Sequence, residues 1–270
     1  MPAIESVCPW WAGVRMRAEE MPTVPRAALV FNDDAVGSIA HPLAVQLCGH
    51  RLPVRFDPAG DSVRLLGDPT RSLAEIAAWL REHEHAAPWR DELIAVTTKS
   101  GRRIGCVERA VVRNLGISTQ AVQLHGQAAK TNLYWLQQRA FDKATDPGRW
   151  DTLIGGLVAD GETPLQTLGR EALEEAGLRI NDLASLKSCG SFTQRRPVHD
   201  AGTHGYMVET LHALRCVVPA ACEPSNMDGE VARFDRFDRY QIVEAIDRSD
   251  VTLEAAIAIA LCEHSWSGRD

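Results

Sequence analysis

The sequence lacks several features that would place it in common classes of protein. No apolar stretch approaches the length of a membrane-spanning helix, and no run of lysines or basic arm is present. The formal net charge of −7 argues against a protein that coats nucleic acid or lies on a membrane surface. The N-terminal residues lack a charged segment followed by an apolar core, so they do not read as a signal peptide. A Gly-rich GK[ST] phosphate loop is also missing, which disfavours a kinase.

Cysteine and histidine spacings are equally uninformative about metal or disulfide sites. The seven cysteines form no CxxC pair, and the nine histidines form no HExxH motif. An odd number of cysteines without framework spacing indicates reduced thiols, and it predicts a cytoplasmic location.

The length of 270 residues and the hydrophobic content of 45% allow a large core and two domains. We expect a small N-terminal α+β domain over residues 1–103 and a second domain over residues 104–270. In the first, apolar runs around residues 26–40 predict strands, and a turn at 58–61 predicts a hairpin. Ser72 and Glu75 have capping-box spacing and predict a helix to about residue 85, followed by extended structure over 89–100.

In the second part, the segment 105–115 predicts a helix that ends at Gly116. Later segments predict a mixed sheet flanked by helices, which is an α/β/α sandwich. The predicted strands lie at 118–128, 131–140, 185–194 and 206–218, and a closing strand and helices begin at residue 232.

Residues 156–178 carry the most informative pattern of the chain, and they predict a helix over about 164–176. Thr163 suits the N-cap, Pro164 the first helical position, and Gln166 completes a capping box with Thr163. Gly177 stands where a left-handed C-cap belongs. The spacing of the apolar residues predicts one stripe on this helix, made of Leu165, Leu168 and Ala172.

Three glutamates on the predicted helix point to metal chemistry. Glu171, Glu174 and Glu175 are spaced i, i+3, i+4, so they share a face and repel one another. A hard cation with oxygen ligands would offset that repulsion, and Mg²⁺ is the usual choice beside phosphates. The alternative is a solvated acidic face, but the strand-like TLIGG segment, the Gly155-Gly156 turn and Arg170 argue against it.

The spacing resembles the signature of the Nudix (MutT-like) hydrolases, G-x5-E-x7-R-E-U-x-E-E-x-G-U, where U is a bulky aliphatic residue. Ala172 at one aliphatic position is smaller than usual. The resemblance implies a Nudix α/β/α sandwich with a mixed sheet. It also implies hydrolysis of a diphosphate linked to another moiety, with Mg²⁺ or Mn²⁺. All seven fixed positions match: Gly156, Glu162, Arg170, Glu171, Glu174, Glu175 and Gly177.

The same resemblance implies roles for individual residues. Glu174 and Glu175 would be metal ligands, and Glu171 a ligand or the base that prepares the water. The carbonyl group of Gly155 is a further expected ligand. Arg170 would brace the glutamate cluster, including Glu162 or Glu171, rather than contact the substrate.

Three residues outside the signature are further candidates. Glu230, in NMDGEV, follows a strand-like run and would be another metal ligand or the base, although D-G-E is also an ordinary turn composition. Arg139 and Lys143 lie upstream of the catalytic loop and would pair with a terminal phosphate, with surface salt bridges as the alternative. Aromatic walls for a substrate ring are also conceivable, although core positions are the commoner use, at Trp89, Trp150 and Phe192.

Flanking segments resemble one Nudix subgroup, the thiamin-pyrophosphokinase-like proteins of plants, fungi and bacteria, which have a small N-terminal domain. The segments are NDDAVGSIAHPLA, PWRDELIAV, CVERA, QLHG, QQRAFDKATDPGRWD and NMDGEV. The sequence departs from that pattern around Gly101 and at 190–206. The subgroup implies thiamin diphosphate or its damaged analogues as substrate.

Two alternatives stay open. One is a pyrophosphatase for a nucleoside diphosphate linked to another group, such as a nucleotide sugar or a dinucleotide. The other is a non-catalytic Nudix-fold binding module, but such modules generally lose glutamates that this chain keeps. We expect a small-molecule partner and neither nucleic acid nor membrane, with a homodimer among the open oligomeric states.

Overall fold

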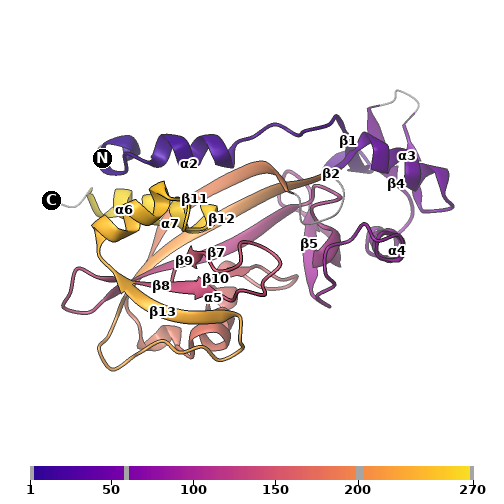
Figure 1. Cartoon of the computed structure of the whole chain (residues 1–270). Helices are drawn as coiled ribbons and strands as arrows, with labels where there is room; N and C mark the ends of the chain where they lie inside the picture. The colour runs from indigo at the N-terminus through magenta and orange to yellow at the C-terminus, as the bar shows by residue number, and fades with distance from the viewer. Residues whose placement is uncertain (1–2, 58–60, 199–203, 268–270) are drawn as a thin grey trace.

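The structure is a computed structural model and describes residues 3–57, 61–198 and 204–267. It has two lobes (Figure 1). The amino-terminal lobe, residues 26–117, holds a four-stranded sheet and a two-stranded sheet. The carboxy-terminal lobe, residues 118–267, holds a seven-stranded sheet. Helices α1 (Ile4–Val7) and α2 (Trp11–Ala18) lie beside the carboxy-terminal lobe, where they pack against its last helix.

The four-stranded sheet has the order β2-β1-β4-β3, and its strands include the predicted hairpin. In that sheet β1 and β4 are parallel, while β1 pairs with β2 and β3 with β4 in antiparallel fashion. The buried side of α4 packs on this lobe through Leu73, Ile76 and Leu80, so the predicted helix is confirmed. The elements are β1 (Arg26–Phe31), β2 (Asp34–Ala40), α3 (His41–Gly49), β3 (Val54–Phe56), β4 (Ser62–Leu65) and α4 (Pro69–Glu82).

The start of α4 differs from the prediction. Asp68 is the N-cap, and its carboxylate accepts the Arg71 backbone N–H at 2.9 Å. Pro69 begins the helix one turn earlier than expected, since a proline fits the first turn without losing a hydrogen bond. The predicted capping box at Ser72 and Glu75 is therefore wrong, and the Ser72 hydroxyl donates instead to the Leu66 carbonyl at 2.5 Å.

The predicted helix over 105–115 is also wrong. The chain forms β6 (Arg103–Glu108), which pairs antiparallel with β5 (Leu93–Thr97), and then a 3₁₀ turn, η1 (Arg109–Val111). Gly105 lies against α4, where an added Cβ would meet the Thr70 hydroxyl at 2.6 Å. Strand pairing and this close approach outweigh the helical spacing of the apolar residues.

The seven-stranded sheet is mixed: β12 runs parallel to β7, and the other neighbouring strands of the sheet pair in antiparallel fashion. One face packs on α7, α1 and α2, and the other packs on α5, so the fold is an α/β/α sandwich. The strands are β7 (Ser118–Ala128), β8 (Tyr134–Arg139), β9 (Trp150–Asp151), β10 (Ile154–Leu157), β11 (Ala184–Val198), β12 (Gly205–Val218) and β13 (Val231–Phe237). The helical elements are α5 (Pro164–Ala176), η2 (Ile180–Asp182), α6 (Arg239–Asp247) and α7 (Leu253–Ser267).

The second segment that departs from the subgroup pattern, residues 190–206, is mostly strand. Residues up to 198 belong to β11, which pairs along its length with β12, and residues 199–203 lie outside the described part. None of the helices in the described ranges is long and apolar enough to cross a membrane. The domain division at residues 103 and 104 stays a prediction.

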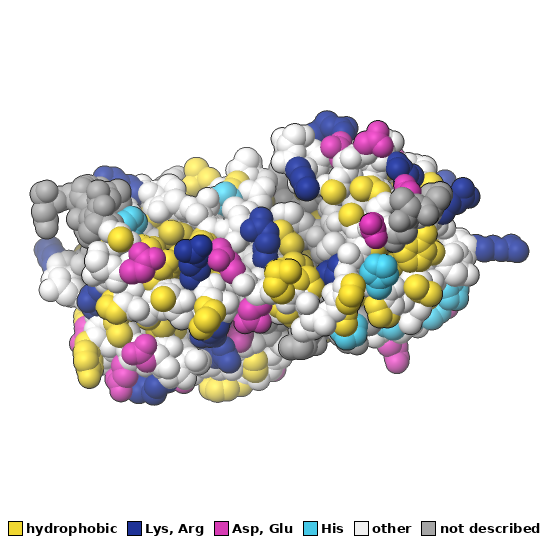
Figure 2. All heavy atoms as spheres, turned by 90° about the horizontal axis from the view of Figure 1, so that it is seen from above, with side chains coloured by type: hydrophobic (Ala, Val, Ile, Leu, Met, Phe, Trp, Pro, Cys, Tyr) yellow, Lys and Arg dark blue, Asp and Glu magenta, His cyan; other side chains and the backbone are white. Residues whose placement is uncertain are grey.

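Specific contacts hold the two lobes together. Arg103 donates to the Asp160 carboxylate at 2.7 and 2.5 Å, and the Asp160 N–H donates to the Leu93 carbonyl at 2.7 Å. The Tyr206 N–H donates to the Arg113 carbonyl at 2.9 Å. Seen from above, basic and acidic side chains are interspersed over this face of the molecule (Figure 2).

Candidate active site

The predicted helix over 164–176 is confirmed as α5. Thr163 accepts the Gln166 N–H, and the Gln166 side chain reaches back to the Thr163 N–H at 2.9 Å. Gly177 adopts a left-handed conformation with φ of 65° and ends the helix. Leu168 and Ala172 are buried, whereas Leu165 is exposed at the first turn, so the predicted stripe is correct in two of its three residues.

Arg170 holds three carboxylates at once. Its guanidinium donates to Glu162 at 2.9 and 3.1 Å, and to Glu171 and Glu174 at 2.9 Å each. The hydrogen bond from Arg170 keeps the pKa of Glu162 below its usual range, and the same bond raises the pKa of Arg170. Glu162 also accepts the Thr167 hydroxyl at 2.7 Å. The arginine thus links the start of the signature to the acidic face of α5.

Glu175 of α5 is 5% exposed and the Glu171 side chain is 14% exposed, although a charged carboxylate is costly to bury. Burial raises the pKa of Glu175 to about 8, and repulsion from Glu171 and Asp151 adds to the effect. Burial likewise raises the pKa of Glu171 to about 7, against the opposing charge of Arg170. Glu175 accepts the Gly155 N–H at 3.1 Å and the Gln137 amide at 3.2 Å.

The two glycines before the signature helix allow β10 to approach these carboxylates. A methyl group at Gly156 would overlap the carboxyl group of Glu171. A methyl group at Gly155 would lie 2.5 Å from the Gln123 amide nitrogen. Glycine at 156 thus leaves room for the Glu171 carboxyl group, and glycine at 155 leaves room for the Gln123 amide.

The donor set fits a divalent cation. Glu171 and Glu175 are hard oxygen donors that repel each other in a buried place, and a divalent cation would relieve that repulsion. Within the described ranges no three His, Cys, Asp or Glu side chains already surround one point. Glu174 is half exposed and turned to Arg170, and Glu175 is held by Gly155 and Gln137.

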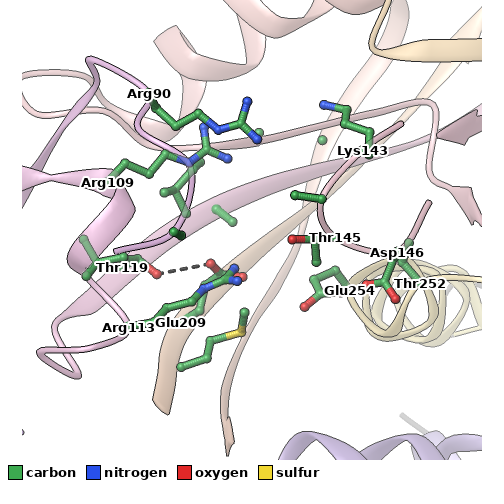
Figure 3. Close-up of a pocket in the computed structure, with 18 of the residues that line it drawn as sticks. Arg90, Arg109, Arg113, Thr119, Lys143, Thr145, Asp146, Glu209, Thr252 and Glu254 are labelled. Carbon is green, nitrogen blue, oxygen red and sulfur yellow. Dashed lines mark hydrogen bonds between the residues drawn. The ribbon is translucent and has the colours of Figure 1, made fainter. Parts of the chain in front are cut away.

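A cavity of about 220 Å³ opens beside β10 and lies between the two lobes (Figure 3). Gly155 and Gly156 form its wall toward α5. Cationic side chains line another part of it: Arg90, Arg109, Arg113 and Lys143. Its floor is polar and includes Thr119, Glu209, Thr252 and Glu254.

The floor is a hydrogen-bonded network rather than a set of isolated charges. Glu209 accepts the Thr119 hydroxyl at 3.1 Å and the Gln194 amide at 3.0 Å. Burial and the neighbouring Glu254 raise the pKa of Glu209. Glu254 pairs with Arg196 at 3.0 Å, and this charge lowers its pKa although burial opposes the shift. Such a network can recognise hydrogen-bonding groups on a ligand.

The three charged candidates outside the signature, Glu230, Arg139 and Lys143, line the cavity. Lys143 forms an ion pair with Glu230; although burial opposes the shift, this contact lowers the pKa of Glu230. Arg139 donates to the Thr145 carbonyl at 2.9 and 3.1 Å and faces Asp151 at 3.6 Å. The guanidinium of Arg139 therefore holds the 143–146 loop, whereas Lys143 and Glu230 sit together at the cavity wall.

The glutamates of α5 are not themselves lining residues, because Glu171 lies behind Gly156 and Glu174 points to Arg170. Glu162 and Gly177 likewise serve the helix rather than the cavity. The three aromatic candidates lie elsewhere: the Arg81 guanidinium lies over Trp89, and Trp150 and Phe192 make edge-to-face contacts with Phe237 and Trp11. No aromatic side chain in the described residues lines the cavity.

Sequence reasoning missed several lining residues. Asp151 is buried, and burial raises its pKa to about 6 despite the charge of Arg139. Arg90, Arg109, Glu209 and Glu254 carry no recognisable spacing, since they come from segments far apart in the sequence that meet only in the folded chain.

Comparison with known proteins identifies the family. A model of the NUDIX domain matches residues 117–255, just over half of the chain. The chain belongs to the Nudix family. An uncharacterized Nudix hydrolase of Pseudomonas aeruginosa is 34% identical over 184 residues, which cover 67% of this chain and 93% of that protein.

Two more distant relatives match similar parts of the chain. Nudix hydrolase 20, chloroplastic, of Arabidopsis thaliana is 26% identical over 187 residues, which cover 67% of this chain. The match spans only 48% of that relative's length. Isopentenyl-diphosphate Delta-isomerase of Corynebacterium glutamicum is 25% identical over 162 residues, covering 58% of this chain and 82% of the relative.

Family membership and the Nudix hydrolase relatives support a pyrophosphohydrolase, an enzyme that hydrolyses phosphoric anhydrides. Nudix hydrolases generally use divalent metals, which agrees with the acidic face of α5. The described fold is the Nudix α/β/α sandwich that the signature implies.

Proposed function

We propose that the chain is a metal-dependent hydrolase that cleaves the diphosphate linkage of a small organic diphosphate. One observation carries this proposal. Glu171 and Glu175 of the signature, the first largely and the second fully buried, lie behind the glycine wall of a cavity, and cationic side chains line another part of that cavity. A diphosphate bound there would lie between a metal site and positive side chains.

The metal would be Mg²⁺ or Mn²⁺, and the groups that would hold it are Glu171, Glu174, Glu175, Glu230 and the Gly155 carbonyl. When bound, the metal polarises the phosphoryl oxygens and lowers the pKa of water. Arg170 positions Glu174 and Glu171 for this task through its 2.9 Å hydrogen bonds. Glu230 lines the cavity directly whereas Glu171 lies behind Gly156, which favours Glu230 as the group that takes the proton of the attacking water.

The substrate that we propose first is thiamin diphosphate or a damaged analogue, on the resemblance to the thiamin-pyrophosphokinase-like subgroup. The polar floor supports an organic group with hydrogen-bonding atoms, such as an amino-substituted ring, over an isoprenoid chain. A pyrophosphatase for a nucleoside diphosphate linked to another group is the second candidate, since its sugar hydroxyls would suit the same floor. We further propose a cytoplasmic location, which agrees with seven cysteines that form no disulfide. We also propose that the chain forms a homodimer.

The test is release of phosphate and monophosphate from a panel of diphosphates with Mg²⁺ or Mn²⁺ and an EDTA control. The panel holds thiamin diphosphate and its oxidised analogues, isopentenyl diphosphate, ADP-ribose, NADH, dinucleoside polyphosphates and nucleoside triphosphates. Metal-dependent cleavage of the thiamin compounds alone is the expected result. Preference for a nucleotide compound would support the proposed hydrolysis of a diphosphate and rule out thiamin diphosphate as the main substrate. No turnover of any compound, with metal bound, would favour a ligand-binding module.

A further inference from the structure

Three arginines of the cavity, Arg90, Arg109 and Arg113, lie outside the matched Nudix residues 117–255. Arg90 lies in the loop before β5, and Arg109 follows β6; together they are called the arginine pair. In Figure 3 the arginine pair and the Lys143 ammonium point toward one another across the cavity. The amino-terminal lobe thus contributes part of the cavity wall, in addition to its contacts with the sheet.

Buried and backbone contacts fix the place of the arginine pair. Glu108 is 5% exposed, and its carboxylate accepts the Arg90 N–H at 3.0 Å and the Ala110 N–H at 3.4 Å. The Arg109 N–H donates to the Glu92 carbonyl at 2.8 Å, and its guanidinium contacts the Glu92 carboxylate at 2.6 Å. One buried acid therefore ties both segments together, which preorganises the pair before a ligand arrives.

The pair is close to the residues that we place in the reaction. Both arginines line the same cavity as Glu230, and Lys143 forms an ion pair with Glu230. The side chain of Arg90 has no hydrogen-bond or ion-pair partner in the ranges that the structure describes. A cation held beside a reaction centre without a partner is suited to an anionic ligand.

We propose that the arginine pair, together with Lys143, binds the terminal phosphate of the substrate, and that the amino-terminal lobe thereby completes the active site. This inference rests on the proposed diphosphate hydrolysis. The planar fork of an arginine contacts two phosphate oxygens at once, and Lys143 adds a point charge from the opposite side. The α5 side of the cavity then serves the metal, and the arginine pair serves the anionic end of the substrate.

The experiment compares the wild-type chain with Arg90→Gln, Arg109→Gln and the double variant. Arg102→Gln is the matched control, because Arg102 is an exposed arginine of the same lobe that pairs with Asp34 at 2.7 Å and does not line the cavity. Arg109→Lys keeps the charge and removes the fork. Two readouts are needed: calorimetric binding of methylene diphosphonate, a diphosphate that cannot be hydrolysed, with Mg²⁺, and kcat and KM on the best substrate of the panel.

We expect each single Gln variant to weaken methylene diphosphonate binding about tenfold, the double variant more, and Arg109→Lys to recover part of the loss. KM should rise similarly, while kcat stays within about threefold and Arg102→Gln matches the wild type. A chain that hydrolyses nothing but binds the diphosphonate through the arginine pair would sink the proposed function and keep this inference. Unchanged affinity in the folded double variant, or no binding by the wild type, would overturn the inference.

Discussion

The two sides of the cavity are built in different ways. On the α5 side, acidic groups come from one short segment, and a single arginine, Arg170, holds three of them at hydrogen-bond distance. On the opposite side, cations come from three separate segments, and the buried carboxylate of Glu108 ties two of them together. The acidic side is local and compact, whereas the basic side depends on how the lobes dock.

From this difference we infer that the residues for the reaction and the residues that select the substrate lie in different parts of the chain. The spacing of the glutamates is set by one helix, so changes elsewhere leave it intact. The arginine pair moves with the amino-terminal lobe, so its distance from the glutamates depends on contacts such as the one between Arg103 and Asp160. Substitutions on the acidic side should lower kcat, and substitutions on the basic side should raise KM.

The largest expected effect is that of Glu174→Gln. We expect kcat to fall by more than the roughly hundredfold that loss of a group hydrogen-bonded to a metal ligand causes. The fold should survive, since the Glu174 side chain is 50% exposed. Turnover with Mg²⁺ and the melting temperature check this pair of outcomes. Near wild-type rates in a folded variant would remove Glu174 from the metal site.

Arg170→Lys should come next, with a fall in kcat of about 10- to 100-fold. Lysine keeps the charge but cannot hold Glu162, Glu171 and Glu174 together, because it lacks the planar fork. The measurement is kcat and KM on the same substrate. A rise in KM with unchanged kcat would contradict the positioning role and assign Arg170 to substrate binding.

Gly156→Ala should lower kcat about tenfold, short of the hundredfold that a 1 Å misplacement can cause. The added methyl group would overlap the Glu171 carboxyl group and push it from its place. Gly13→Ala is the control, because nothing lies within 4 Å of its added Cβ, and Gly13 is inside α2. That control should leave turnover unchanged and stabilise the chain by about 0.5–1 kcal/mol. Equal losses in both variants would mean that Gly156 has no special relation to Glu171.

The smallest effect concerns salt. Raising the ionic strength from 0.05 to 0.5 M should increase KM by about threefold and leave kcat nearly unchanged, because salt screens the exposed guanidinium groups from the substrate phosphates. The double variant of Arg90 and Arg109 should show a weaker dependence. A steeper dependence in that variant would show that other cations govern binding.

Local signals explain why α5 was predictable. Its two ends are set by Thr163, Gln166 and Gly177, whose capping contacts reach only one helical turn along the chain. The helix in the structure has the predicted bounds. The strands over 118–128 and 206–218 were also recognisable, since β-rich runs between turn residues define them. The spacing of the glutamates alone indicates only a divalent cation. The resemblance to the Nudix family is what predicted the hydrolysis of a diphosphate.

Tertiary contacts explain the failures. In 105–115 the buried residues suit a helix as well as a strand followed by a turn, and pairing with β5 decides between them. Asp68 was overlooked because Ser72 and Glu75 have the same spacing as a true capping box. The arginine pair had no signal at all, because positions 90, 109 and 143 meet only after the lobes dock.

The most direct test of the account is a titration of Mn²⁺ followed by electron paramagnetic resonance, on the wild-type chain, Glu174→Gln and the double variant of Arg90 and Arg109. We expect the wild type to bind Mn²⁺ and Glu174→Gln to bind Mn²⁺ at least about tenfold more weakly. The double arginine variant should bind Mn²⁺ with the affinity of the wild type. No binding by the wild type, or equal affinity in Glu174→Gln, would contradict the claim that α5 forms the metal site of this cavity.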